Sequence, residues 1–291
     1  MRKWPALQVG RLTRVASEGP ELLQAALVDY QVAAISESTP DTWQIFFDSS
    51  AERDRAARAL ADQFRELSVA SIDVPDEDWV ARSQADLRAV RVGNIIVAPP
   101  WDLPGAGSVA LDPAGEFGGP ATGEPIVIVI RPSMGFGTAH HATTRLCLAA
   151  LQRLDVDGRA VVDVGTGSGV LAIAASRLGA TSVVGIDDDP DALQAAGDNL
   201  TLNPDATVTF RESDARSIGL DGFDLVMANL TGALLVAAAL PIRSLVKPGG
   251  YLVLSGLLEE EAPTVLSAYA GCLVHNRSQE GEWLCLSLQR L

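Results

Sequence analysis

The stretch Val161-Val162-Asp163-Val164-Gly165-Thr166-Gly167-Ser168-Gly169 decides the fold of this chain, because it joins an apolar strand to a turn with three alternating glycines. Glycine tolerates positive φ and lets the backbone approach a ligand where a Cβ would collide. A helix that begins near Ser168 would turn its free N–H groups toward the same place. The stretch therefore predicts a nucleotide-type binding site, although such a turn can also be a simple connection between a strand and a helix.

The spacing of the glycines separates two classes of cofactor. The fingerprint of dinucleotide-binding proteins, G-x-G-x-x-G, needs a glycine where this chain has Val170. In those proteins the N-terminus of the helix holds a pyrophosphate, a group that S-adenosylmethionine lacks. The spacing therefore favours S-adenosylmethionine over a dinucleotide.

Two further strands are predicted to end beside this turn. Ser182–Asp187 has the pattern of a buried strand and ends in an acid that can accept hydrogen bonds from two ribose hydroxyls. The strand 224–229 ends in Asn229. Because ligands of open α/β sheets lie outside the carboxyl ends of the strands, we expect Gly165, Asp187 and Asn229 to surround one crevice.

Polar residues after strands also have a simpler interpretation, which is to cap the helix that follows. Asp189 stands directly before Pro190, a residue that is favoured at the first position of a helix. Asn229 could likewise cap the helix that starts from Thr231. On sequence alone, both interpretations stay open.

Residues 1–75 predict a small domain of their own. The pattern of apolar residues gives the order βαββαβ, which is typical of a ferredoxin-like α+β fold. We expect this domain to recognise the substrate or to serve as a scaffold, because it contains no constellation of titratable residues. The predicted elements are strands 6–10, 32–37, 43–48 and 69–74 and helices 20–30 and 51–66.

Residues 126–291 alternate between predicted strands and helices, which indicates a parallel sheet with helices on both faces. A terminal hairpin would supply a sixth strand and an antiparallel seventh, as in the doubly wound, Rossmann-like α/β fold of S-adenosylmethionine methyltransferases. We interpret residues 76–104 as an interdomain linker and the start of the catalytic region, and residues 105–125 as an insertion loop. The predicted strands are 94–98, 126–130, 160–165, 182–187, 208–212, 224–229 and 251–255, with a turn at 247–250, and the hairpin strands are 272–276 and 282–289.

The charge of the chain bears on its partners. A formal net charge of −15 argues against direct binding to nucleic acid, which needs a concentrated basic surface. A basic protein would be attracted instead, although an acidic surface can also serve only to keep a protein in solution. The apolar run 230–242 is too short to cross a bilayer. We therefore expect a cytoplasmic protein that binds no membrane, and we expect a monomer.

The sequence does not predict a metal site. The three cysteines are widely spaced and form no C-x-x-C pair, so neither a zinc site nor a disulfide framework is indicated. The adjacent side chains of His140 and His141 diverge in an extended loop, and His275 lies in a distant strand. We expect His141 to shape the loop around the cofactor.

The segment Arg131–Thr144, with the sequence RPSMGFGTAHHATT, resembles the F-G-T-G-x-H-x-T-T signature of the bacterial methyltransferases that modify ribosomal large-subunit protein eleven, the PrmA family. Two positions depart from the family pattern: Ala139 replaces the second glycine of F-G-T-G, and Thr231 stands where an aliphatic residue is usual. The resemblance covers nearly the whole chain, and it continues through Glu77-Asp78-Trp79, the glycine-rich stretch, Gly185–Pro190, Asp198-Asn199, Ala228–Leu230, Ser255-Gly256 and Glu282-Trp283.

The resemblance implies S-adenosylmethionine as the cofactor and a basic ribosomal large-subunit protein as the substrate. It implies methyl transfer to lysine ε-amino groups, to an N-terminal α-amino group, or to both. Asn229 would be the catalytic residue and orient the amine through its side-chain oxygen. The family's cofactor contacts fall on Thr144, Gly165, Asp187 and Asn229, related enzymes contact adenine at the position of Asp214, and Thr138 and Gly167 belong to the same two motifs.

Methyl transfer from a sulfonium is an in-line displacement, so positioning a neutral amine in a water-poor pocket can supply most of the catalysis. A lysine amine must first lose its proton, because its usual pKa is about 10.4. Two alternatives remain open. The chain could be a methyltransferase of the same fold that acts on another protein or a small molecule, or a cofactor-binding protein without activity.

Overall fold

The computed structural model describes residues 3–10, 27, 30, 32–39, 42–47, 49–64, 67–75, 87–104, 124–132 and 140–291. The chain divides into two compact units, Met1–Asp86 and Leu87–Leu291. The predicted helix 20–30 lies almost entirely outside the described residues, as does the predicted insertion 105–125, apart from its last two positions. Residues 76–86 of the predicted linker 76–104 also lie outside them.

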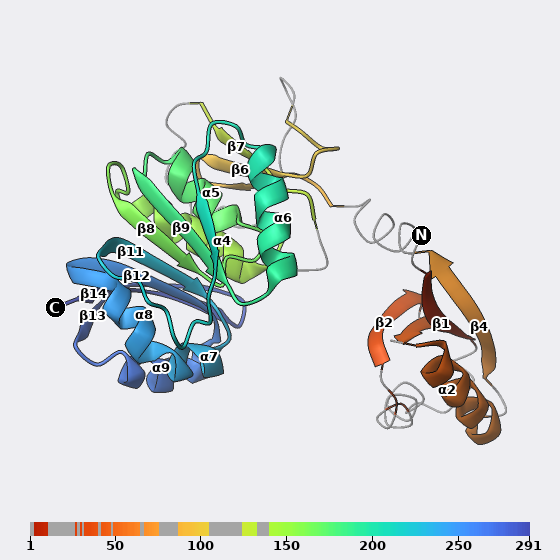
Figure 1. The fold of residues 1–291 in the computed structure, drawn as a ribbon. Coiled ribbons are helices and arrows are strands. Elements are labelled where there is room, and N and C mark those ends of the chain that lie inside the picture. Colours follow the sequence, from red (N-terminus) through yellow and green to blue (C-terminus); the bar gives the residue numbers. More distant parts are fainter. Residues whose placement is uncertain are drawn as a thin grey trace. The chain divides into compact units, whose positions relative to one another are not determined.

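The first unit is built on an antiparallel sheet of four strands with the order β2-β3-β1-β4 (Figure 1). Helix α2 packs on one face of this sheet, because Ala56 and Leu60 share a buried cluster with Leu7 and Ile45 of the strands. Ser49 caps the helix by accepting a hydrogen bond from the Glu52 N–H at 3.3 Å. The four predicted strands are present, and the elements are β1 (Lys3–Gly10), β2 (Val32–Thr39), β3 (Thr42–Phe47), α2 (Ser50–Gln63) and β4 (Ser68–Pro75).

The second unit contains a sheet of seven strands with the order β10-β9-β8-β11-β12-β14-β13 (Figure 1). Strands β8 to β12 pair in parallel, and β14 runs antiparallel to both of its neighbours. The strands are β8 (Ala160–Val164), β9 (Ser182–Asp187), β10 (Thr209–Glu212), β11 (Phe223–Asn229), β12 (Val246–Leu258), β13 (Cys272–Glu280) and β14 (Trp283–Arg290).

Helices cover both faces of this sheet, which explains why its central strands are apolar at nearly every position. Val161 and Met227 pack in the cluster of α4 and α5, whereas their neighbours Val162 and Val226 pack against helices on the opposite face. The helices are α4 (Ala142–Arg153), α5 (Val170–Arg177), α6 (Pro190–Thr201), α7 (Gly232–Ala237), α8 (Ala239–Leu245) and α9 (Ala262–Ala268), with a 3₁₀ turn at Glu259–Glu261.

A small sheet with the order β5-β6-β7 belongs to the same unit, and its strands are Val90–Val92, Ile95–Ala98 and Ile126–Val129. The Gln152 side chain of α4 joins it to the helix layer, because its oxygen accepts from the Asn94 N–H at 2.8 Å and its nitrogen donates to the Val92 carbonyl at 2.9 Å. Strand β5 was not predicted, because three residues are too few to show a period.

The predicted turn at 247–250 is wrong, since these residues lie within the long strand β12. Phe223 of β11 pairs with Val246, and Leu225 pairs with Tyr251, so the four intervening residues form a bulge. Pro248 and Gly249, which has φ +80°, bend the chain as a turn would, but pairing continues on both sides.

Two glycines of β12 show two different reasons why a position requires glycine, namely the space available for a Cβ and the backbone conformation. Gly249 and Gly256 have nearly equal φ values of +80° and +86°. A Cβ at Gly249 would meet nothing within 4 Å, whereas one at Gly256 would lie 2.3 Å from the carbonyl oxygen of Leu230. Gly256 is therefore required by its neighbours and Gly249 only by its own conformation.

We expect Gly249→Ala to lower the free energy of unfolding by about 1–2 kcal/mol, the usual cost of a left-handed residue. Gly256→Ala should cost at least about 2 kcal/mol more, because the added Cβ displaces the backbone after β11. Urea denaturation of both variants measures the difference. Equal losses would contradict the assigned contact between Gly256 and Leu230.

Candidate functional site

The structure brings Gly165, Asp187 and Asn229 together at one edge of the large sheet. Val164 pairs with Ile186 of β9 on one side and with Ala228 of β11 on the other. The next residue of each strand is therefore in the same row, and neighbouring strands lie about 4.8 Å apart. The predicted convergence of three strand ends follows directly from this register.

The side chains of Asp187 and Asn229 share one face of the sheet. Side chains alternate along a strand, and Val183 and Met227 belong to the cluster of α4 and α5. Asp187 follows Val183 by four positions and Asn229 follows Met227 by two, so both point to the side of these helices. Two polar groups thus stand at the carboxyl edge, on the face that α4 and α5 cover.

Helix α4 begins at the same edge. His141 caps it by accepting a hydrogen bond from the Thr143 N–H, and its ring lies 4.7 Å from the ring of Trp283, which pairs with Leu258 at the end of β12. Thr144, in the first turn of the helix, is 2% exposed. His141 therefore fixes the start of the helix that carries Thr144.

The glycine-rich turn is held by its own backbone. Gly165, Gly167 and Gly169 all have positive φ, at +71°, +52° and +80°. The N–H groups of Gly165 and Thr166 donate to the carbonyl of Ile186 at 2.8 and 2.9 Å, and the Gly169 N–H donates to the carbonyl of Thr166 at 2.8 Å. Helix α5 then starts at Val170, with Gly169 as its cap residue.

The carboxylate of Asp187 binds this turn and still has free positions at which it can accept hydrogen bonds. Its Oδ2 accepts from the Gly167 N–H at 2.9 Å, and its Oδ1 accepts from the Asp189 N–H at 3.1 Å. A carboxylate offers about four acceptor positions, so further hydroxyl groups could donate to it. Asp189 itself caps α6 through the Asp191 N–H at 2.9 Å, as its position before Pro190 predicted.

Asn229 is not a helix cap. Thr231 caps α7, because its hydroxyl accepts from the Leu234 N–H at 3.4 Å. The half-buried amide of Asn229 makes no hydrogen bond to any residue that the structure describes. It is therefore free to bind a ligand at the sheet edge.

Asp214 lies close to this edge but has a partner of its own. The Ser213 N–H donates to the Asp187 carbonyl at 2.8 Å, which places the end of β10 beside Asp187. Both carboxylate oxygens of Asp214 accept from the Arg216 guanidinium, and these hydrogen bonds lower the pKa of Asp214 to about 2. Thr138 and Ala139 lie outside the described residues.

Asp163 is the acid in the apolar strand that leads into the glycine-rich turn, and the sequence motifs gave it no role of its own. It is 1% exposed and precedes the glycine-rich turn on β8, on the face of α4 and α5. The Thr166 hydroxyl donates to its Oδ2 at 2.8 Å, while its Oδ1 has no partner among the described residues. Burial raises the pKa of Asp163 to about 7, against the lowering effect of the Thr166 hydrogen bond. The available signal was an acid within an otherwise apolar strand.

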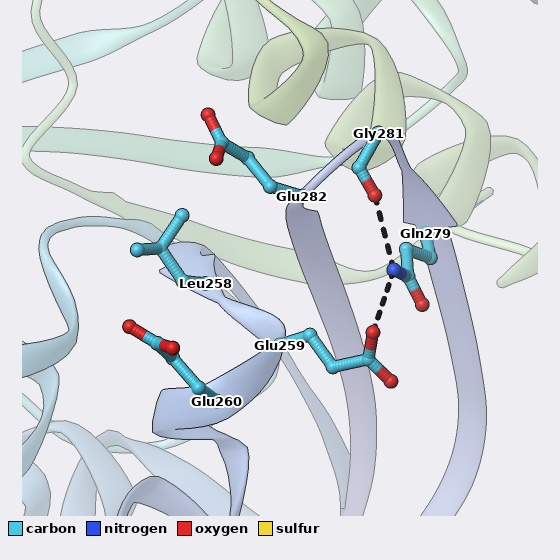
Figure 2. A pocket seen from close by; sticks show the side chains of 6 residues that line it. All are labelled: Leu258, Glu259, Glu260, Gln279, Gly281 and Glu282. Carbon is cyan, nitrogen blue, oxygen red and sulfur yellow. Dashed lines mark hydrogen bonds between the residues drawn. The ribbon is translucent and has the colours of Figure 1, made fainter.

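An acidic pocket of about 530 Å³ opens beyond the end of β12 (Figure 2). Glu259 accepts hydrogen bonds from Gln279 and Arg277, each at 2.8 Å. The pocket lies at the carboxyl end of the strand that pairs with β11, and its carboxylates would attract cations. Its lining consists of Leu258, Glu259, Glu260, Gln279, Gly281 and Glu282.

His275 and the three cysteines are further candidates for ligands or catalytic groups among the described residues, and they have ordinary packing roles. His275 packs its ring 5.1 Å from that of Tyr251, and the three cysteines are free thiols. Among the residues with defined placement, no three His, Cys, Asp or Glu side chains gather as a metal site. No helix in the same residues is long and apolar enough to span a membrane.

The parallel sheet, the glycine-rich turn, the acid that ends β9 and the unpaired Asn229 amide together define an S-adenosylmethionine-dependent methyltransferase of the α/β class. Residues 15–291 match the family described as "Ribosomal protein L11 methyltransferase (PrmA)". The chain belongs to this family, and the predicted resemblance is confirmed.

Individual relatives support the same assignment. The Ribosomal protein L11 methyltransferase of Geobacter sulfurreducens is 35% identical over 288 residues, which cover 94% of this chain and 90% of the relative. That of Myxococcus xanthus is 36% identical over 252 residues, or 84% and 80% of the two chains. The crystal structure of a ribosomal protein L11 methylase from Lactobacillus delbrueckii subsp. bulgaricus superimposes with a TM-score of 0.60 at 26% identity, over 70% of this chain and 99% of that one.

We expect Asp163 to give the chain a characteristic dependence of stability on pH. The pKa of a free aspartate is about 3.9, so between about pH 4 and pH 7 the native state binds a proton that the unfolded chain has released. The free energy of unfolding contributed by Asp163 therefore falls as the pH rises through this range and is level above it.

Asp163→Asn removes this titration while keeping the acceptor for Thr166. Urea denaturation at about pH 5 and about pH 8 should show the variant gaining stability relative to wild type at the higher pH. Asp224→Asn is the control, because Lys247 lowers the pKa of Asp224 and its contribution is lost only below the pKa of a free aspartate. A difference between Asp163→Asn and wild type that is equal at both pH values would contradict the assignment.

Proposed function

We propose that this chain transfers methyl groups from S-adenosylmethionine to lysine ε-amino groups, to the N-terminal α-amino group, or to both, on a basic ribosomal large-subunit protein, the L11 of its relatives. The observation that carries the proposal is the row of Gly165, Asp187 and Asn229 at one sheet edge in a member of this family. The net charge of −15 favours a basic partner.

The cofactor roles follow from chemistry that each residue has available. Asp187 accepts from the two ribose hydroxyls with the lone pairs that Gly167 and Asp189 leave. Gly165 presents backbone to the methionine portion, and Thr144, at the start of α4, presents a hydroxyl. Asp214 lies at the end of β10, where it would meet the adenine, and we assign Thr138 and Gly167 to the same site.

Asn229 serves as the catalytic residue. Bound S-adenosylmethionine supplies a methyl group on a positively charged sulfur. The side-chain oxygen of Asn229 accepts a hydrogen bond from the neutral target amine and leaves the nitrogen lone pair directed at that methyl group. The amine reaches this state after losing a proton, and desolvation by the protein lowers its pKa from about 10.4 and so favours the neutral form.

The first unit serves to recognise the protein substrate. Its strand order β2-β3-β1-β4 is compatible with a ferredoxin-like domain, the interpretation that the βαββαβ pattern gave. We further propose that the protein works as a cytoplasmic monomer and binds no nucleic acid directly.

Asp187→Ala should raise the Kd for S-adenosylhomocysteine by about a hundredfold or more, because two charge-assisted hydrogen bonds are lost. Asp188→Ala is the matched control, since Asp188 is exposed one position further along the chain. Isothermal titration calorimetry measures both, and the control should stay within about twofold of wild type. Equal Kd values for the two variants would contradict the proposal that Asp187 binds the cofactor.

The activity itself is tested with radiolabelled S-adenosylmethionine and unmethylated L11, beside a small-molecule extract. We expect label on lysine or the N-terminal amine of L11, located by mass spectrometry. Asn229→Ala should lower kcat about 10²-fold or more, as other lost positioning groups do, with little change in the Kd for S-adenosylhomocysteine. Label confined to the extract would contradict the protein substrate, and cofactor binding without any label would contradict the enzyme.

A further inference from the structure

Asn199 of α6 and Asn203, which follows the end of that helix, bind the backbone at and just after the end of β7. Asn199 and Asn203 are 1% and 2% exposed. The Asn203 oxygen accepts from the Val129 N–H at 2.9 Å, and its nitrogen donates to the Val129 carbonyl at 2.8 Å. The Asn199 oxygen accepts from the Arg131 N–H at 2.8 Å. The last turn of α6 and the residues directly after it thus supply hydrogen bonds that a neighbouring strand would otherwise make.

The spacing of the two side chains suits this purpose. Asn203 lies after the end of α6, and its side-chain nitrogen donates to the Asn199 carbonyl at 2.7 Å, which keeps the two asparagines adjacent. Val129 and Arg131 are two apart in extended chain, which spans about 6.6 Å. One pair of asparagines therefore fits alternate residues of the chain, with both amides buried and bonded.

Asn199 has a second partner that distinguishes it from Asn203. Its nitrogen donates to the carbonyl of Ser168 at 3.0 Å, within the glycine-rich turn. The hydrogen bonds of the Asn203 side chain go to Val129 and to the Asn199 carbonyl, and none goes to the turn.

The Ser168 carbonyl belongs to the same planar peptide as the Gly169 N–H, which donates to the Thr166 carbonyl at 2.8 Å. Both ends of this peptide are thereby fixed, one by the turn itself and one by Asn199. Because α5 starts directly after Gly169, the orientation of this peptide sets where the turn presents its backbone.

We propose that Asn199 is a positioning residue for S-adenosylmethionine. It acts through Ser168, by holding the glycine-rich turn in register with the backbone at Arg131, and it needs no contact with the cofactor. The inference rests on the cofactor binding proposed for this turn, and it adds to that proposal a residue on a different element.

The test compares Asn199→Asp with Asn203→Asp. Each substitution keeps the size and the accepting oxygen, removes a donating amide and buries a carboxylate. Asn203→Asp loses two donated hydrogen bonds and Asn199→Asp loses one, so general destabilisation should be at least as large in the control. Urea denaturation measures that loss, and calorimetry measures the Kd for S-adenosylhomocysteine below the unfolding range of both.

We expect Asn199→Asp to raise the Kd by about tenfold, because an oxygen now faces the Ser168 carbonyl, and Asn203→Asp to change it by less than about threefold. The KM for S-adenosylmethionine should rise in parallel, with the KM for the protein substrate unchanged. If either variant fails to fold, Asn199→Ala and Asn203→Ala repeat the comparison without a buried charge, with about a fivefold rise expected for the former.

Equal Kd changes in the two variants, or a Kd for the Asn199 variants within about twofold of wild type, would overturn the positioning role. Failure of the wild-type chain to bind S-adenosylhomocysteine would overturn the cofactor site together with this inference. The two failures are therefore distinguished by the wild-type titration alone.

Discussion

The carbonyl oxygen of Ile186 accepts hydrogen bonds from the N–H groups of both Gly165 and Thr166, and the arrangement of the site depends on this double contact. It continues the pairing of β8 with β9 beyond the last residue of β8. The chain can then turn sharply only through residues that accept positive φ. The same turn brings the Gly167 N–H to the carboxylate of Asp187, so the acid is oriented by the loop beside which it stands.

Burial of the sheet on both faces explains which polar groups can be retained. Alternate residues of the central strands face either α4 and α5 or the helices of the opposite face, and a polar side chain among them loses its hydration. Asp163 keeps only the Thr166 hydroxyl as a side-chain partner, and its pKa rises accordingly. Its cost to stability is tolerated at the edge where the polar groups of the site gather, as is common for functional sites.

Features of the fold and of the site could be predicted from the sequence where residues close together in the chain determine them. The glycine-rich turn, the Asp189 cap and the strands that end at Asp187 and Asn229 were predictable, because neighbouring residues determine them. The sequence at 247–250 predicts a turn although the residues form a bulge, since proline and glycine occur in both and only the pairing partner distinguishes them.

Contacts between distant segments left no such signal. The Asn199 side chain forms hydrogen bonds with Ser168, 31 positions away in the sequence, and with Arg131, 68 positions away. No pattern in the sequence indicates these contacts. The three-residue strand β5 depends in the same way on a distant side chain of α4. The register that places Gly165, Asp187 and Asn229 in one row could be argued from the general rule for parallel sheets, but the unpaired state of the Asn229 amide could not.

Thr231 helps to explain that unpaired amide. Its hydroxyl caps α7, so the helix needs no cap from Asn229. The residue between them is held on both sides, because the Leu230 N–H donates to the Ser255 carbonyl at 2.9 Å and its side chain occupies the space that a Cβ at Gly165 would need. Asn229 is therefore fixed at its backbone and free at its amide. That combination is what a group requires if it is to orient a reacting amine without reorganising during the reaction.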